Sequence, residues 1–80
     1  MKISIEYCNS WNYLPRASRM AADLLDKYGN SITNFSLIPS SGGVYEVMKN
    51  DQVIFSKKEL NRFPNEGEVE ELLEGWEEVK

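Results

Sequence analysis

The sequence predicts an α+β domain of the broad α/β class, a β-α-β-β-β-α sandwich whose helices pack on a four-stranded mixed sheet. Residues 2–7 alternate apolar and polar side chains, which is the period of a half-buried strand. Two segments that begin at Leu14 and Val69 space their apolar residues three and four apart, as amphipathic helices do. Between them, three short apolar segments are separated by Pro, Gly, Asn and Asp, residues typical of turns.

The first strand is followed by a polar loop over residues 8–12 and then by a helix. Asn12 is its expected N-cap, and Pro15 is tolerated in the first turn, where backbone N–H groups lack helical partners. Gly29-Asn30 supplies a residue able to adopt positive φ, which ends such a helix. The expected buried face consists of Leu14, Ala17, Ala21, Leu24, Leu25 and Tyr28.

The second strand is expected over residues 33–38, with Phe35 and Leu37 on one face, and residues 39–43 form a turn. Residues 44–49 and 52–57 read as a hairpin joined by Asn50-Asp51, which accept left-handed conformations. A right-handed parallel crossover joins the first two strands. The parallel unit and the antiparallel hairpin together predict a mixed sheet.

Residues 58–65 are expected to form an irregular connector before the last helix. Asn65 and Glu68 have the spacing of a capping box, with Asn65 as N-cap. Gly75 and the acidic end of this helix predict fraying there. The expected apolar face consists of Val69, Leu72, Leu73, Trp76 and Val79.

Length and charge restrict the classes of function. Eighty residues form one domain, residues 1–80, near the lower size limit for folding without disulfides or metals. A net charge of −4 and a pI near 4.7 argue against nucleic acid and anionic membranes as partners. No apolar run approaches the roughly 20 residues of a membrane span. The opening residues read as a strand rather than a signal peptide.

The chain has one cysteine, Cys8, and no histidine. An internal disulfide, a conventional zinc site within one chain and histidine-based catalysis are therefore excluded. We expect no metal and no resident cofactor. A lone thiol is typical of a reducing compartment, so a cytoplasmic location is expected.

Cys8 lies directly after the first strand and before the first helix. Helix N-termini stabilise thiolates, so this position favours a catalytic nucleophile. The alternative is an inert structural cysteine, the commoner fate of a lone thiol, and position by itself leaves both open.

The segment from Tyr7 to Ala17 resembles the redox loop of the selenoprotein W-like Rdx family, which places Cys-x-x-Cys or Cys-x-x-selenocysteine after its first strand. The resemblance extends through Gly42-Gly43-Val44-Tyr45-Glu46-Val47, the hairpin end Ile54-Phe55-Ser56-Lys57-Lys58, and Arg62-Phe63-Pro64. It implies a thioredoxin-like fold and a thiol oxidoreductase role, with glutathione or a protein thiol as the partner. It also implies a site made of Cys8, its redox-loop neighbours Asn9, Ser10 and Trp11, and a facing loop of Ser41, Gly42 and Gly43.

The chain departs from this family at Trp11, which stands where the second redox residue is expected. A dithiol cycle needs a resolving thiol, so that mechanism is excluded. Three accounts stay open: Cys8 acts as a monothiol resolved by glutathione, the redox function has been lost, or position 11 corresponds to a selenocysteine codon. Paired glycines most often only make a turn, so the facing loop has a purely structural alternative as well.

A second class of function is a non-enzymatic interaction module on the same fold. Trp11 and Tyr13 lie in a polar loop beside Asn9 and Ser10, which predicts partial exposure of their rings. Exposed large apolar groups often mark contact sites. Loss of partner binding on Trp11→Ala, with Cys8→Ser tolerated, distinguishes this hypothesis from the redox one. The sequence leaves the oligomeric state open.

Overall fold

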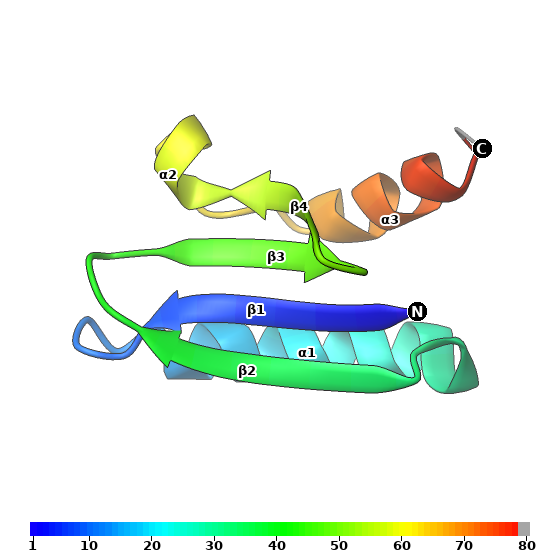
Figure 1. The fold of residues 1–80 in the computed structure, drawn as a ribbon, viewed down its shortest axis with the longest axis horizontal. Helices are drawn as coiled ribbons and strands as arrows, with labels where there is room; N and C mark the ends of the chain where they lie inside the picture. The colour runs from blue at the N-terminus through cyan, green and yellow to red at the C-terminus, as the bar shows by residue number, and fades with distance from the viewer. Residues whose placement is uncertain (79–80) are drawn as a thin grey trace.

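A computed structural model describes the backbone of residues 1–78 and the side chains of residues 1–74. The predicted order of strands and long helices is confirmed, with two short helical turns added (Figure 1). The elements are β1 (Lys2–Cys8), α1 (Leu14–Tyr28), the 3-10 turn η1 (Gly29–Ser31), β2 (Asn34–Ser40), β3 (Tyr45–Lys49), β4 (Gln52–Ser56), α2 (Lys57–Leu60) and α3 (Glu68–Glu78).

The sheet is mixed, as predicted, with the strand order β2-β1-β3-β4. Strand β1 pairs with β2 in parallel and with β3 antiparallel, and β3 pairs with β4 antiparallel. Helix α1 lies behind β1 and β2 in Figure 1. The crossover through α1 therefore joins the two parallel strands, and β1 occupies the middle of the sheet.

The hydrophobic core lies on one face of the sheet. Alternate residues Ile3, Ile5 and Tyr7 of β1 point into it. Both long helices contribute to the same buried cluster, which also contains Ala17, Leu24, Ile32, Tyr45, Val47, Phe55, Val69 and Leu73. The fold is thus a two-layer sandwich. The predicted face of α1 was wrong at Leu14 and Leu25, whose side chains are exposed because they lie at the margin of the helical stripe.

The start of α1 differs from the prediction. Tyr13, not Asn12, is the N-cap, with φ −83° and no capping hydrogen bond from its side chain. Asn12 instead adopts a left-handed φ of 61°, which turns the chain one residue earlier. Pro15 lies in the first turn and Gly29 ends the helix with φ 51°, both as expected.

Pro39 and Ser40 extend β2, although a turn was predicted there. Pro39 aligns with Tyr7, and Ser40 aligns with Cys8. The Ser40 carbonyl accepts the Asn9 N–H at 3.0 Å, so the backbone of Ser40 faces β1 and that of Pro39 faces away. Because β2 is an edge strand, the N–H that proline lacks is not needed for pairing.

The hairpin between β3 and β4 has the predicted turn, since Asn50 and Asp51 adopt φ 50° and 70°. Val47 pairs with Phe55, whereas Met48 pairs with Val53, so β4 carries one extra residue at a bulge. The register shift bends the outer strand of the sheet locally.

The connector after β4 is more ordered than predicted, because residues 57–60 form the short helix α2. The Ser56 hydroxyl accepts the Glu59 N–H at 3.2 Å as an N-cap, and Asn61 ends the turn with φ 58°. A strand was expected to continue through Lys57. Because Ser56 caps a helix, Lys57 becomes the first residue of that helix instead.

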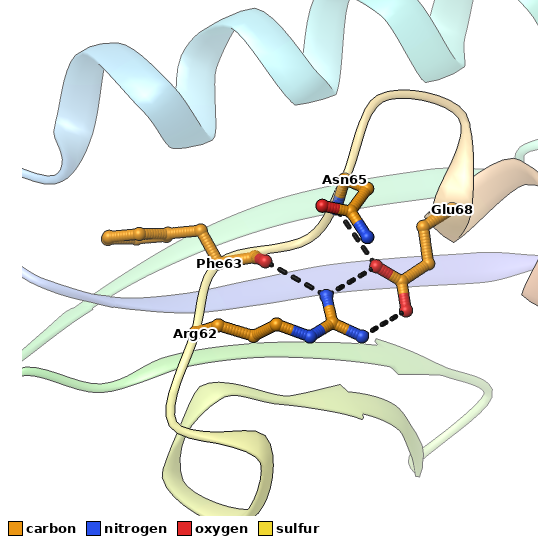
Figure 2. Close-up of polar contacts among 4 residues, drawn as sticks. All are labelled: Arg62, Phe63, Asn65 and Glu68. Atoms are coloured by element: carbon orange, nitrogen blue, oxygen red, sulfur yellow. Dashed lines mark hydrogen bonds and ion pairs between the residues drawn. The ribbon is translucent and has the colours of Figure 1, made fainter.

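An ion pair fixes the remainder of the connector to α3 (Figure 2). The Glu68 carboxylate accepts hydrogen bonds from both terminal nitrogens of Arg62, at 2.7 and 2.8 Å, and from the Asn65 N–H, at 2.9 Å. The last contact is the carboxylate half of the predicted capping box. The side chain of Trp76 and all of Val79 lie outside the described residues. The backbone of α3 is helical through Glu78, and fraying at this end stays a prediction.

Candidate thiol site

Cys8 lies where three segments meet at the carboxyl end of β1. Its N–H donates to the Val44 carbonyl at 2.9 Å, and its carbonyl accepts the Tyr13 N–H at 3.2 Å. On the other side it aligns with Ser40 of β2. The redox loop therefore begins between two strands that fix the cysteine backbone on both sides.

The Cys8 side chain is completely buried, with an exposed fraction of 0%. It nevertheless lies outside the hydrophobic core cluster. Side chains alternate along a strand and Tyr7 points into the core, so Cys8 points toward the opposite side. This arrangement separates the thiol from the apolar packing that stabilises the fold.

Backbone N–H groups surround the sulfur. Burial alone raises the pKa of the Cys8 thiol, but hydrogen bonds from the Gly43 and Trp11 N–H groups, the Ser10 hydroxyl and the Ser10 N–H lower it, and the net pKa lies below its ordinary value. The sequence suggested the first turn of α1 as the source of these donors. They come instead from the preceding loop and from the loop before β3, because α1 begins only at Leu14.

Of the predicted facing loop, Gly43 is the residue that meets Cys8. Gly42 and Gly43 adopt φ 80° and 72°, conformations that suit glycine. A Cβ built on Gly43 would lie 2.5 Å from Cζ3 of Trp11, whereas one on Gly42 would meet open space. Ser41 is exposed. Gly43 therefore does more than make a turn, because the Trp11 side chain lies against its backbone where any Cβ would clash.

The redox-loop neighbours have separate roles. The Asn9 N–H donates to Ser40 and its carbonyl accepts the Asn12 N–H at 3.1 Å, which closes a tight turn. Ser10 directs both a hydroxyl and an N–H at the sulfur. The side chain of Trp11 is 62% exposed, as predicted, and its indole rests on Gly43. The backbone N–H of Trp11 thus donates to the thiol, whereas its ring is largely exposed to solvent.

Sequence reasoning missed an aromatic cluster next to this loop, formed by Trp11, Tyr13, Phe63 and Tyr45. Their successive ring centroids lie 6.2, 4.9 and 5.3 Å apart in edge-to-face contacts. Figure 2 shows the Phe63 ring pointing away from the Arg62–Glu68 pair. Phe63 and Trp11 are distant in the chain, so only the fold reveals their proximity.

Two cations flank Phe63 in this cluster. The guanidinium carbon of Arg16 lies 3.9 Å from the ring centroid, and the Lys57 ammonium lies 5.4 Å from it and 5.8 Å from the Tyr13 centroid. All three distances are typical of cation–π contacts. The spacing of Tyr13, the N-cap of α1, and Arg16 in its first turn was the one local signal, since residues three apart lie on the same side of a helix.

Two further kinds of site were sought in the described part of the chain, a metal site and a membrane-spanning helix. Within it, no three Cys, Asp or Glu side chains gather in a way that could hold a metal ion. Among the helices described, none is long and apolar enough to cross a bilayer.

Comparison with known proteins identifies the family. The family model described as the Rdx family matches residues 2–75. This chain belongs to the Rdx family. The family resemblance inferred from the sequence is therefore confirmed. Among curated protein sequences, none matches this Rdx protein.

Solved structures agree with the fold of this Rdx protein. A protein from Bordetella parapertussis superposes with a TM-score of 0.88 at 27% identity, covering 92% of this chain and 94% of that one. A selenoprotein W-related protein from Vibrio cholerae gives a TM-score of 0.88 at 25% identity, with 94% of each chain covered. Both structures share the α+β fold of this Rdx protein, and the second of them is a selenoprotein W-related protein.

Proposed function

We propose that this chain is a thiol redox protein that uses Cys8 as a monothiol, with glutathione as co-substrate, in the reducing cytoplasm. The observation that carries the proposal is the set of hydrogen-bond donors from Ser10, Trp11 and Gly43 around the sulfur. These donors favour the thiolate, which is the nucleophile in thiol–disulfide exchange. Membership of the Rdx family supports a redox role of this type.

The proposed exchange has two steps. The Cys8 thiolate attacks the glutathione sulfur of a protein–glutathione mixed disulfide, the disulfide breaks, and the protein thiolate leaves. A glutathione thiolate then attacks the glutathione sulfur bound to Cys8, which releases glutathione disulfide and restores the Cys8 thiolate. The donors around Cys8 stabilise the leaving thiolate in the second step. Trp11 supplies no resolving thiol, and this route needs none.

The buried sulfur must become accessible for this reaction. The turn over residues 9–12 is held by the Asn9 and Asn12 N–H groups, and its aromatic residue is largely exposed. We propose that a local opening of this turn exposes Sγ, since few backbone hydrogen bonds resist the movement. The alkylation rate then depends on both the opening and the thiolate fraction.

The test is a pH titration of the alkylation rate of Cys8 in the reduced protein. Cys8 is the only cysteine, so the whole signal belongs to it, and Cys8→Ser gives the blank. We expect a midpoint below that of an unstructured peptide with the same Tyr-Cys-Asn-Ser sequence. In urea the midpoint should return to the peptide value. A folded-state midpoint at or above the peptide value contradicts the proposal.

One observation favours the alternative function, a non-enzymatic interaction module. The indole of Trp11 is 62% exposed, although large aromatic side chains usually bury most of their surface. This alternative requires that binding survive Cys8→Ser and weaken on Trp11→Ala. Exchange between Cys8 and glutathionylated substrates distinguishes the redox function from it.

A further inference from the structure

The surface beside Cys8 combines exposed aromatic area with positive charge. Trp11 offers the exposed ring, and Tyr13 and Phe63 continue it edge to face. Arg16 and Lys57 lie against Phe63. We call Trp11, Tyr13, Phe63, Arg16 and Lys57 the cationic aromatic surface. It adjoins the thiol because the Trp11 indole rests on Gly43, whose N–H contacts the sulfur.

The charge of this surface is opposite to that of the chain. The protein has 13 acidic and 9 basic residues, for a net charge of −4. Ion pairs bind Lys27 to Glu74 and Arg62 to Glu68. Within the described side chains, neither Arg16 nor Lys57 forms such a pair. Two cations therefore remain available for an external carboxylate on an otherwise acidic molecule.

We propose that the cationic aromatic surface docks acidic peptide segments, and that it thereby selects protein mixed disulfides whose cysteine has Asp or Glu neighbours. The Trp11 indole gives such a segment an apolar anchor of the kind that dominates peptide and protein binding. Arg16 and Lys57 give it charge complementarity, which favours acidic over basic sequences. This substrate preference rests on the proposed function, whereas the docking itself does not require Cys8.

The contacts with Phe63 prepare both cations for binding. An arginine side chain loses conformational entropy when it is ordered by a ligand. Arg16 already lies over the ring at 3.9 Å, so part of this ordering precedes binding. A guanidinium that lies over an aromatic ring can still donate hydrogen bonds from its N–H groups. The Arg62–Glu68 pair in turn fixes Phe63, because Arg62 also donates to the Phe63 carbonyl at 3.1 Å.

The experiment uses two synthetic peptides of equal length with one glutathionylated cysteine, flanked either by Asp and Glu or by Lys. Their affinities for Cys8→Ser protein are measured by fluorescence anisotropy at low salt. We expect the acidic peptide to bind about fivefold tighter or more, as two partly exposed ion pairs allow. The preference should shrink at high salt. Equal binding of the two peptides overturns the proposal.

Matched variants test whether Arg16 and Lys57 cause the preference for the acidic peptide. Arg16→Gln and Lys57→Gln, each in the Cys8→Ser background, should each reduce the ratio of the two affinities by about two- to fivefold. Arg16→Lys retains the charge and should retain most of the ratio. Arg19→Gln and Lys58→Gln remove cations outside the surface and should leave the ratio unchanged. Equal losses in both groups overturn the proposal in favour of a net-charge effect.

Exchange rates of the wild-type protein with the same two peptides separate the two proposals. Docking of the acidic peptide without exchange at Cys8 contradicts the redox function and supports the docking surface. Exchange at equal rates with both peptides overturns the substrate preference and leaves the redox function standing. A concentration-dependent dimer that Arg16→Gln dissociates, with no peptide binding, overturns the proposal in favour of a second copy as the occupant.

Discussion

Two connectors of this molecule hold functional side chains by opposite means. The turn around Cys8 is fixed by backbone N–H groups and by two glycines with positive φ. The connector that presents Phe63 is fixed by side-chain contacts among Arg62, Glu68 and the backbone of Asn65. The first arrangement depends on backbone conformation and the second on charge. They should therefore respond differently to substitution, pH and salt.

The largest effect should follow Gly43→Ala. Alanine at this position would be held in a left-handed conformation, and its Cβ would displace the Trp11 indole. We therefore expect a loss of about 2 kcal/mol in the free energy of unfolding, measured with urea. The alkylation midpoint of Cys8 should rise because the Gly43 N–H moves. Trp11 fluorescence, followed in a Trp76→Phe background, should shift toward that of a solvated indole.

Gly42→Ala is the control for this change. Its φ of 80° imposes a similar strain, but the added methyl meets open space. We expect a loss of about 1 kcal/mol and no change at Cys8. Equal losses for the two variants, with an unchanged Cys8 midpoint, would show that the approach of Trp11 to Gly43 is unimportant.

Glu68→Gln should have a smaller effect that depends on pH. The Arg62 guanidinium and the Asn65 N–H lower the pKa of Glu68 from 4.5 to about 2. This stabilisation is complete above pH 4.5 and is lost as the pH falls through about 2. The difference in thermal midpoint between wild type and variant should therefore be constant near neutral pH and vanish in acid.

Glu71→Gln provides the comparison on the same helix, since the Glu71 side chain is exposed and the residue's hydrogen bond to Gly67 runs through its backbone N–H. Its thermal midpoint should follow the wild type throughout. High salt should reduce the effect of Glu68→Gln and leave that of Gly43→Ala unchanged. A pH-independent effect of Glu68→Gln would assign the stabilisation to packing rather than to the ion pair.

The smallest effect is expected for Asn12→Gly. Asn12 adopts φ 61°, which glycine accepts more readily, while glycine also loses more entropy on folding. These effects oppose each other, so the free energy of unfolding should change by no more than about 0.5 kcal/mol. The Cys8 midpoint should stay the same. A large shift of that midpoint would mean that the Asn12 side chain helps to hold the turn.

The sequence was sufficient for the order of the strands along the chain and for the mixed character of the sheet. Alternation over residues 2–7 and the Asn50-Asp51 turn are local signals, and the structure agrees with both. Errors occurred where a neighbouring element decides the outcome. Pro39 stays in a strand because β2 is at the edge, and Ser56 begins a helix because its hydroxyl caps one. A single sequence does not specify such relations.

The candidate site was predictable in part for the same reason. Cys8 and the position of its loop follow from the order of elements, whereas the donors at Gly43 follow from how two distant backbones meet. The contact of Phe63 with Tyr13 depends on the Arg62–Glu68 pair, which joins an irregular segment to the first residue of α3 six residues later. Hydrophobic periodicity carries no information on such a segment.

Pro39 has a consequence for the behaviour of the protein at high concentration. Its backbone faces away from β1, so the open side of β2 lacks one donor in the row that an incoming strand would need. Exposed sheet edges are templates for strand addition and aggregation, and proline is a common way to interrupt them. At the other edge, the bulge in β4 breaks the regular ladder. Each end of the sheet thus carries an obstacle to its growth into fibrils.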